Sequence, residues 1–218
     1  MSDQLGGVGP QDHPNDQPQN PGKRKVDEGH RHWRSEADPH ITRGGEHFED
    51  QETGHFTLVA SVDGKYLVEA DQEHQMANGG IVNPGVTINK AVGVRYGNSK
   101  MTFDVVSKVA QLNGTVLTGQ GPWGDSDLKV ELLASNRYKV ASAEGDVVEI
   151  QGEGVWTTLI GTLGPDRCEG DVRGAFGIFT NADGDVTHLK RDGSKANSIL
   201  ELITNWLTTG DEELFPAA

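Results

Sequence analysis

Oxygen-bearing side chains alternate along one short stretch of the chain. Asn181, Asp183 and Asp185 are separated by single small residues. When such a loop curls, alternate side chains direct their oxygen atoms to one point, and a hard cation such as Ca²⁺ prefers that arrangement. An ordinary turn rich in Asn and Asp uses the same residue types. The stretch is therefore a candidate calcium site, with a plain turn as the alternative.

The segment Asp38-Pro39-His40 suggests a second kind of chemistry. The Asp38 carboxylate can attack its own backbone carbonyl, which forms an anhydride and expels the nitrogen of Pro39 once that nitrogen is protonated. The His40 imidazole can supply or relay the proton at mildly acidic pH. Such a chain would cut itself once. The alternative is structural, with Pro39 fixing φ and Asp38 capping a turn at the start of the first strand.

Histidines are frequent in the early part of the sequence, but their spacing is irregular. Zinc needs three or four ligands that converge tetrahedrally, and no cysteine is available near them. We expect surface side chains that change charge at about pH 6 rather than a zinc site. The sequence also lacks a nucleophile elbow, a phosphate loop and a dinucleotide fingerprint, so we do not expect a turnover enzyme. The histidines concerned are His30, His32, His40, His47 and His55.

The charge of the chain limits its expected partners. The 218 residues carry a formal net charge of −14, which disfavours nucleic acid because basic side chains must displace counterions from phosphates. No apolar run approaches the roughly 20 residues that span a bilayer, so we expect no membrane insertion. A single cysteine, Cys168, excludes an internal disulfide, and packing must hold the fold together, alone or with a metal. Other proteins are the expected partners.

Alternating apolar residues predict β-strands over most of the chain. Phe56, Leu58 and Ala60 begin the pattern, and residues 86–96 and 101–105 continue it. Strict alternation is typical of a sheet with one buried face. We therefore expect an all-β fold, mainly an antiparallel sandwich or barrel-like sheet. Further short strands are predicted at residues 128–132, 138–141, 147–150 and 155–160.

Two local signals predict a hairpin and a helix. Asn113-Gly114 lies between two apolar stretches, which is typical of a two-residue type I′ turn. Ser198 followed by Glu201 forms a capping box, and the apolar residues that follow have helical spacing up to Trp206. We expect one short C-terminal helix packed on the sheet.

The N-terminal part differs in composition from the rest of the chain. Residues 1–36 are rich in proline, glycine and glutamine, with almost nothing apolar before Trp33, so we predict a disordered tail. One β domain is predicted over residues 37–216. The first residues lack the basic-then-apolar pattern of a secretory signal. The chain then stays inside the cell, leaves by a route without a signal, or is shown without its leader.

Motifs at both ends of the predicted domain occur in a characteristic order. Residues 37–42 (Ala-Asp-Pro-His-Ile-Thr) resemble the Gly-Asp-Pro-His opening of von Willebrand factor type D domains. Residues 174–179 (Gly-Ala-Phe-Gly-Ile-Phe) are similar to the family's Gly-Leu-Cys-Gly-Asn-Phe, and the Asn-Trp and Leu-Phe pairs of the family's end follow. The resemblance covers about residues 37–215. Phe176 takes the place of the family's cysteine, which points to a cysteine-poor version of bacterial or phage type.

The resemblance implies a function as well as a fold. It implies a non-catalytic binding, adhesion or assembly module that contacts other proteins in an extracellular, surface or particle assembly, such as a phage tail or an injection machine. Family members often bind calcium at the loop that corresponds to Asn181, Asp183 and Asp185, and some cleave themselves at the bond that corresponds to Asp38-Pro39. Self-cleavage is the alternative function. Disulfide-linked polymers are excluded here, whereas a homo-oligomer is compatible with the sequence.

Overall fold

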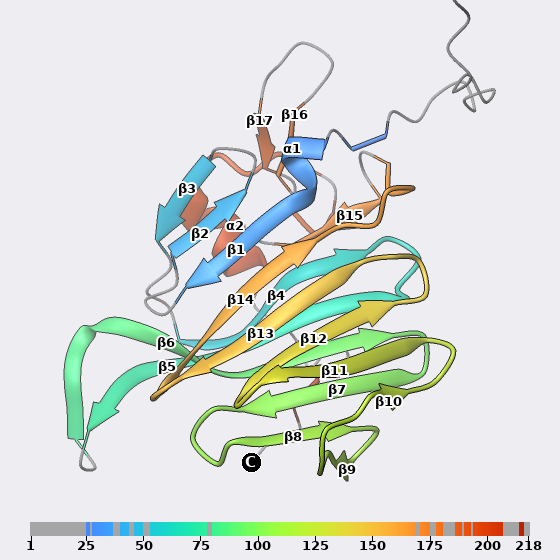
Figure 1. Ribbon diagram of the computed structural model, residues 1–218. Helices are drawn as coiled ribbons and strands as arrows, with labels where there is room; N and C mark the ends of the chain where they lie inside the picture. Colours follow the sequence, from blue (N-terminus) through green and yellow to red (C-terminus); the bar gives the residue numbers. More distant parts are fainter. Residues whose placement is uncertain are drawn as a thin grey trace, which may run out of the picture.

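Two antiparallel β-sheets make up most of the molecule (Figure 1). The computed structural model describes residues 25–26, 28–36, 40–43, 46–49, 53–77, 80–168, 171–174, 178–180, 186–188, 190–192, 194–206 and 214–215. The two sheets pack against each other around a common core. This arrangement confirms the predicted all-β sandwich.

One sheet has eight strands and brings the start of the described chain next to a much later segment. Its strand β1 pairs with β14, with Trp33 opposite Gly161. In sheet order the strands are β10 (Trp123–Gly124), β11 (Leu128–Ala134), β12 (Arg137–Ser142), β13 (Val147–Glu153), β14 (Trp156–Thr162), β1 (His32–Glu36), β2 (His40–Arg43) and β3 (Glu46–Glu49).

The second sheet has seven strands, most of which follow one another along the chain. Asn113 and Gly114 have φ angles of 51° and 77°, as the predicted type I′ turn between β8 and β9 requires. In sheet order the strands are β15 (Val172–Arg173), β4 (Gly54–Ser61), β5 (Tyr66–Ala77), β6 (Gly80–Tyr96), β7 (Ser99–Asp104), β8 (Val109–Leu112) and β9 (Thr115–Val116). A separate hairpin pairs β16 (Ile178–Thr180) with β17 (Val186–His188).

The space between the two sheets holds one apolar core. Phe56 and Phe103 enter it from the seven-stranded sheet, and Leu128 and Ile150 enter it from the eight-stranded sheet; all four are fully buried. The rings of Phe103 and Tyr138 meet across the core with centroids 5.6 Å apart. Burial of each such side chain stabilises the fold by about 1.5–3 kcal/mol. Packing therefore replaces the disulfides that this chain lacks.

The folded part begins earlier than the sequence predicted. Residues 1–36 were expected to form a tail, but α1 (Glu28–Arg31) and β1 lie within that range, and β1 is a strand of the eight-stranded sheet. Trp33 is buried, Ser35 on the same face is also buried, and Arg34 between them is exposed. Strand β1 is mostly polar, so hydrophobic patterning gave no signal for it. Ladder hydrogen bonds to β14 and one buried tryptophan hold it in the sheet.

The predicted C-terminal helix is confirmed as α2 (Ile199–Asn205). The Ser198 hydroxyl oxygen accepts a hydrogen bond from the backbone N–H of Glu201 at 3.1 Å, which is the expected N-cap contact. Leu202 and Trp206 are buried, and the Trp206 carbonyl oxygen accepts a bond from the backbone N–H of Thr57 in β4. The helix is thereby fixed to the seven-stranded sheet. Neither α1 nor α2 has the length and apolar character to cross a membrane.

Candidate functional site

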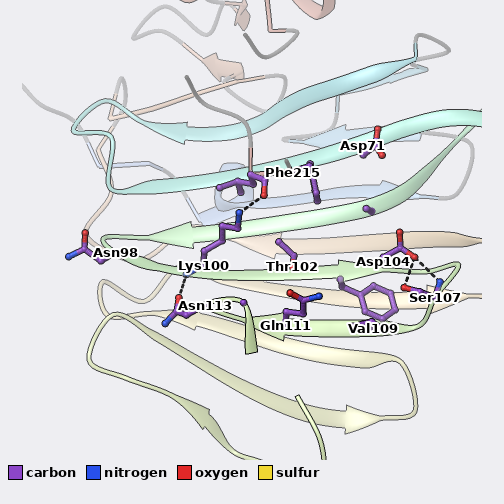
Figure 2. Close-up of a pocket in the computed structure, with 14 residues that line it drawn as sticks. Asp71, Asn98, Lys100, Thr102, Asp104, Ser107, Val109, Gln111, Asn113 and Phe215 are labelled. Atoms are coloured by element: carbon purple, nitrogen blue, oxygen red, sulfur yellow. Dashed lines mark hydrogen bonds between the residues drawn. The ribbon is translucent and has the colours of Figure 1, made fainter. Parts of the chain in front are cut away.

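A groove of about 680 Å³ lies on the outer face of the seven-stranded sheet (Figure 2). Strand β7 explains the polar side chains in the groove, because Met101 and Phe103 point into the core while Lys100, Thr102 and Asp104 point outward. The same alternation continues in the neighbouring strands. The groove is lined by Asp71, Ala91, Asn98, Lys100, Thr102, Phe103, Asp104, Ser107, Val109, Gln111, Asn113, Gly114, Leu214 and Phe215.

Local hydrogen bonds fix the polar side chains at the lower rim of the groove. The Asp104 carboxylate accepts bonds from the backbone N–H and the hydroxyl of Ser107, at 2.7 and 2.9 Å. The side-chain oxygen of Asn113 accepts a bond from the backbone N–H of Lys100 at 2.8 Å. These side chains are held in place by the turns from which they come. The groove therefore offers a preformed row of donors and acceptors to an extended polar ligand.

The upper rim carries an interacting pair of ionisable groups. The Nε2 atom of His55 lies 3.3 Å from the Asp71 carboxylate, and the His55 ring packs against the Phe215 ring with centroids 5.4 Å apart. Burial raises the pKa of Asp71, and the nearby His55 partly opposes that shift. Close by, Lys90 contacts Glu73 at 2.6 Å, and this hydrogen bond raises the pKa of Lys90. The groove thus mixes charges of both signs.

Leu214 and Phe215 close one side of the groove. Leu214 is buried, and its backbone N–H donates a 2.6 Å hydrogen bond to the carboxylate of Glu69 in β5. The Lys100 ammonium group donates a 2.5 Å bond to the carbonyl oxygen of the same residue. Residue 214 is therefore held at its amide and at its carbonyl by two different strands.

Strands β5 and β6 continue beyond the sandwich as a two-stranded ribbon, which we call the arm (residues 73–88; Figure 1). Strand β4 pairs with β5 only as far as Gln72, and β7 pairs with β6 only from Ala91 onward. Within the described residues no third strand pairs with the arm. Its register shifts between His74 and Gln75 and again before Met76, and such bulges bend and twist a ribbon.

A second polar cluster lies at one end of the sandwich. The Arg167 guanidinium donates two hydrogen bonds to the fully buried Asp146 carboxylate, at 3.2 and 2.7 Å. The same carboxylate accepts a bond from the backbone N–H of Gly164, and Arg167 also pairs with Glu144 at 3.1 Å. Arg167 lies over the ring of Tyr66, from the other sheet. This cluster ties the loop that holds Arg167 to strand β5 of the other sheet.

The sequence-predicted site residues have little overlap with these features. Asp38 and Pro39 lie outside the described residues, and His40 is the first residue of β2, with its backbone opposite Glu49. Asn181, Asp183 and Asp185 also lie outside the described residues. They belong to the connection between β16 and β17, which pair with Thr180 opposite Val186.

The described histidines do not come together. His32 hydrogen-bonds with Thr162, His47 with Thr42, and His55 contacts Asp71. Among the residues that the structure covers, no three or more His, Cys, Asp or Glu side chains form a group that could hold a metal ion. Cys168 is half-buried.

Sequence reasoning did not identify the groove or the arm. The alternation in β7 shows a polar face, but it does not show that a distant segment returns to cover part of that face.

Comparison of the chain with models of known protein families gives no match, and comparison with curated proteins gives none either.

Proposed function

We propose that this chain is a non-catalytic assembly module of von Willebrand factor type D character, and that the arm is the part that contacts its partner. The resemblance suggests the class, and the arm carries the proposal. An isolated two-stranded ribbon is at best marginally stable in water. A ribbon that extends from a stable body gains stability when a partner covers its edges or faces.

The composition of the arm favours contact with another protein. Residues 75–88 contain no Asp, Glu, Lys or Arg, although the chain as a whole has a net charge of −14. Centres of protein interfaces are depleted in charged residues. Two copies of so acidic a chain repel each other over most of their surfaces. Contact through residues 75–88 of the two arms avoids that repulsion, so we propose self-association through the arm in an extracellular, surface or particle assembly.

Calcium belongs to the proposal through the resemblance alone. Asn181, Asp183 and Asp185 would hold the ion, because alternate oxygen atoms in a short connection suit its coordination. The ion would stabilise the connection between β16 and β17 rather than take part in a reaction.

Light scattering after size-exclusion chromatography tests the role of the arm. In the shortened protein, residues 75–86 are replaced by Asn-Gly, since His74 lies opposite Thr87 and a two-residue type I′ turn can join them. We expect the full chain to associate as its concentration rises and the shortened chain to remain a monomer with its fold intact by circular dichroism. Equal masses for the two proteins over the whole concentration range contradict the proposal.

A pair of matched substitutions separates the arm from a general effect of charge. Ile81→Lys introduces a positive charge into the arm, and Val106→Lys introduces the same charge at a site that is 66% exposed in the turn after β7. We expect only Ile81→Lys to weaken association, by tenfold or more. Equal behaviour of the two variants would assign the association to another surface.

A further inference from the structure

The outer face of the seven-stranded sheet recognises residue 214 by three separate features. Glu69 of β5 accepts the hydrogen bond from the backbone N–H of Leu214, and Lys100 of β7 donates one to its carbonyl oxygen. Gly93 of β6, between these two strands, leaves room for the leucine side chain. A β-carbon at Gly93 would lie 2.7 Å from Leu214 atoms, which is too close for any larger residue. The amide, the carbonyl and the side chain of Leu214 thus each contact a different strand.

The chemistry of Glu69 resembles that of a binding site more than that of a core position. Its side chain is fully buried on the outer face of the sheet. Burial of a carboxylate is costly unless hydrogen bonds compensate for lost water. Here the backbone N–H of Leu214 supplies such a bond at 2.6 Å, and the hydroxyl of Thr57 donates a longer one at 3.5 Å. The contact depends on a peptide group, which any chain carries, and Gly93 adds selectivity for the side chain.

The site extends beyond the two residues that occupy it. Phe215 packs its ring against His55, and the groove described above begins beside Leu214 and Phe215. Thr102 and Gln111 line its continuation across β7 and β8. An extended peptide is the ligand class that matches such backbone contacts, one small apolar recess and a groove with both polar and apolar side chains.

We infer that this face is a peptide-binding site for a Leu-Phe segment, and that the C-terminal segment of a second copy can replace the chain's own. Residues 207–213 connect Trp206 to Leu214, and an extended connector of this length spans at most about 27 Å. The segment of another copy has the same sequence and makes the same contacts, so the exchange preserves every hydrogen bond. The site is distinct from the arm, and its test does not depend on self-association through the arm.

A labelled peptide tests the site in the full-length protein. The probe is a fluorescein-labelled peptide with the sequence of residues 211–218, and its matched control has alanine in place of the leucine. Leu214→Ala weakens the hold on the chain's own segment. We expect saturable binding of the probe to the Leu214→Ala protein, at least tenfold weaker binding to the wild type, and at least tenfold weaker binding of the control peptide.

A second substitution closes the recess. Adding Gly93→Val to Leu214→Ala should abolish probe binding, because the new side chain fills the place of the leucine. The inference is overturned if the folded Leu214→Ala protein does not bind the probe, or if it binds the alanine peptide equally well. It is also overturned if Leu214→Ala unfolds the whole protein, since the segment would then be part of the folding core.

Hydrogen exchange in the wild type provides a measurement without any variant. The Leu214 amide should be protected by its bond to Glu69, and it should exchange at least tenfold faster than the amides of β5 and β6 in the core. Low concentrations of urea should leave its exchange rate unchanged, as local release requires. Exchange of this amide only by global unfolding, or a complete lack of protection, contradicts an exchangeable segment.

Discussion

Two buried carboxylates in this molecule have very different partners. Asp146, at one end of the sandwich, receives two hydrogen bonds from the Arg167 guanidinium. Glu69, on the outer face of the seven-stranded sheet, receives neutral donors instead, namely the backbone N–H of Leu214 at 2.6 Å and the hydroxyl of Thr57 at 3.5 Å. Both side chains are shielded from water to the same extent. Their environments are therefore comparable, and the difference lies in what satisfies the charge.

The Asp146–Arg167 pair is a fixed crosslink, whereas we propose that the bond between Glu69 and Leu214 is a docking contact. A buried ion pair is strongly destabilised when one partner is removed, because the remaining charge has no compensation. Arg167 lies over Tyr66 of the opposite sheet, so that pair also connects the two layers. The Leu214 partner of Glu69 comes instead from the C-terminal part of the chain, and we expect it to leave without disturbing the layers.

The largest effect is expected from Arg167→Leu. The substitution leaves Asp146 buried without its positive partner and should lower the free energy of unfolding by about 3–5 kcal/mol. Urea denaturation followed by circular dichroism measures the loss. The control is Arg137→Leu, since the pair of Arg137 with Glu149 is half-exposed and contributes at most about 1 kcal/mol. Equal losses in the two variants would show that Asp146 does not depend on its crosslink.

A smaller and more local effect is expected from Glu69→Gln. The amide keeps an acceptor but loses the charge, so the free energy of unfolding should fall by about 1–2 kcal/mol. Hydrogen exchange should show faster exchange at Leu214 and little change in the core strands. Glu73→Gln, on the same strand but half-exposed and paired with Lys90, is the control. A uniform increase in exchange throughout the sandwich would make Glu69 a global crosslink like Asp146.

An exposed carboxylate extends the comparison to acidic pH. A hydrogen bond from Ser99, followed by the backbone N–H groups of Leu128 and Asp127, lowers the pKa of Asp125 below its ordinary value of 3.8. A lowered pKa in the folded state stabilises the fold above pH 3.8, and this contribution is lost as the pH falls through the lower folded-state value. Thermal melts at a series of pH values should therefore show a shallower acid-side decrease for Asp125→Asn. Identical slopes for variant and wild type contradict this.

The smallest effect on stability is expected from calcium, which we propose to bind at Asp183 and Asp185. With free calcium at about five times a millimolar dissociation constant, stabilisation is about 1 kcal/mol, or about 2–4 °C in Tm. Chelator should reverse the increase. A protein with Asp183→Ala and Asp185→Ala should not respond, whereas Asp166→Ala, at a carboxylate that is 86% exposed, should respond fully. An unchanged Tm in the wild type excludes the site.

Local patterns predicted the elements that depend on local physics. The alternation of Met101, Phe103 and Val105, the Asn113-Gly114 turn and the Ser198 cap all occur as expected. Each of them is determined by residues close in sequence. Strand β1 was missed because a polar strand with one buried tryptophan has the composition of a linker.

The candidate site could not be predicted for a different reason. Glu69 and Lys100 have no special spacing in the sequence, and their common function depends on the return of Leu214 from far along the chain. The length of the arm also depends on where β4 and β7 stop pairing, which sequence patterning does not report.

The pairing of β1 with β14 has a consequence for biosynthesis. Strands β4 to β8 pair with their immediate sequence neighbours, so these hairpins can close while the ribosome is still adding residues. Trp33 can pair with Gly161 only after residue 161 has left the ribosome. Strands β2 and β3 join the sheet only through β1. The nascent chain therefore carries an open edge on β14 until β1 pairs with it, and we expect mispairing to be most frequent during that interval.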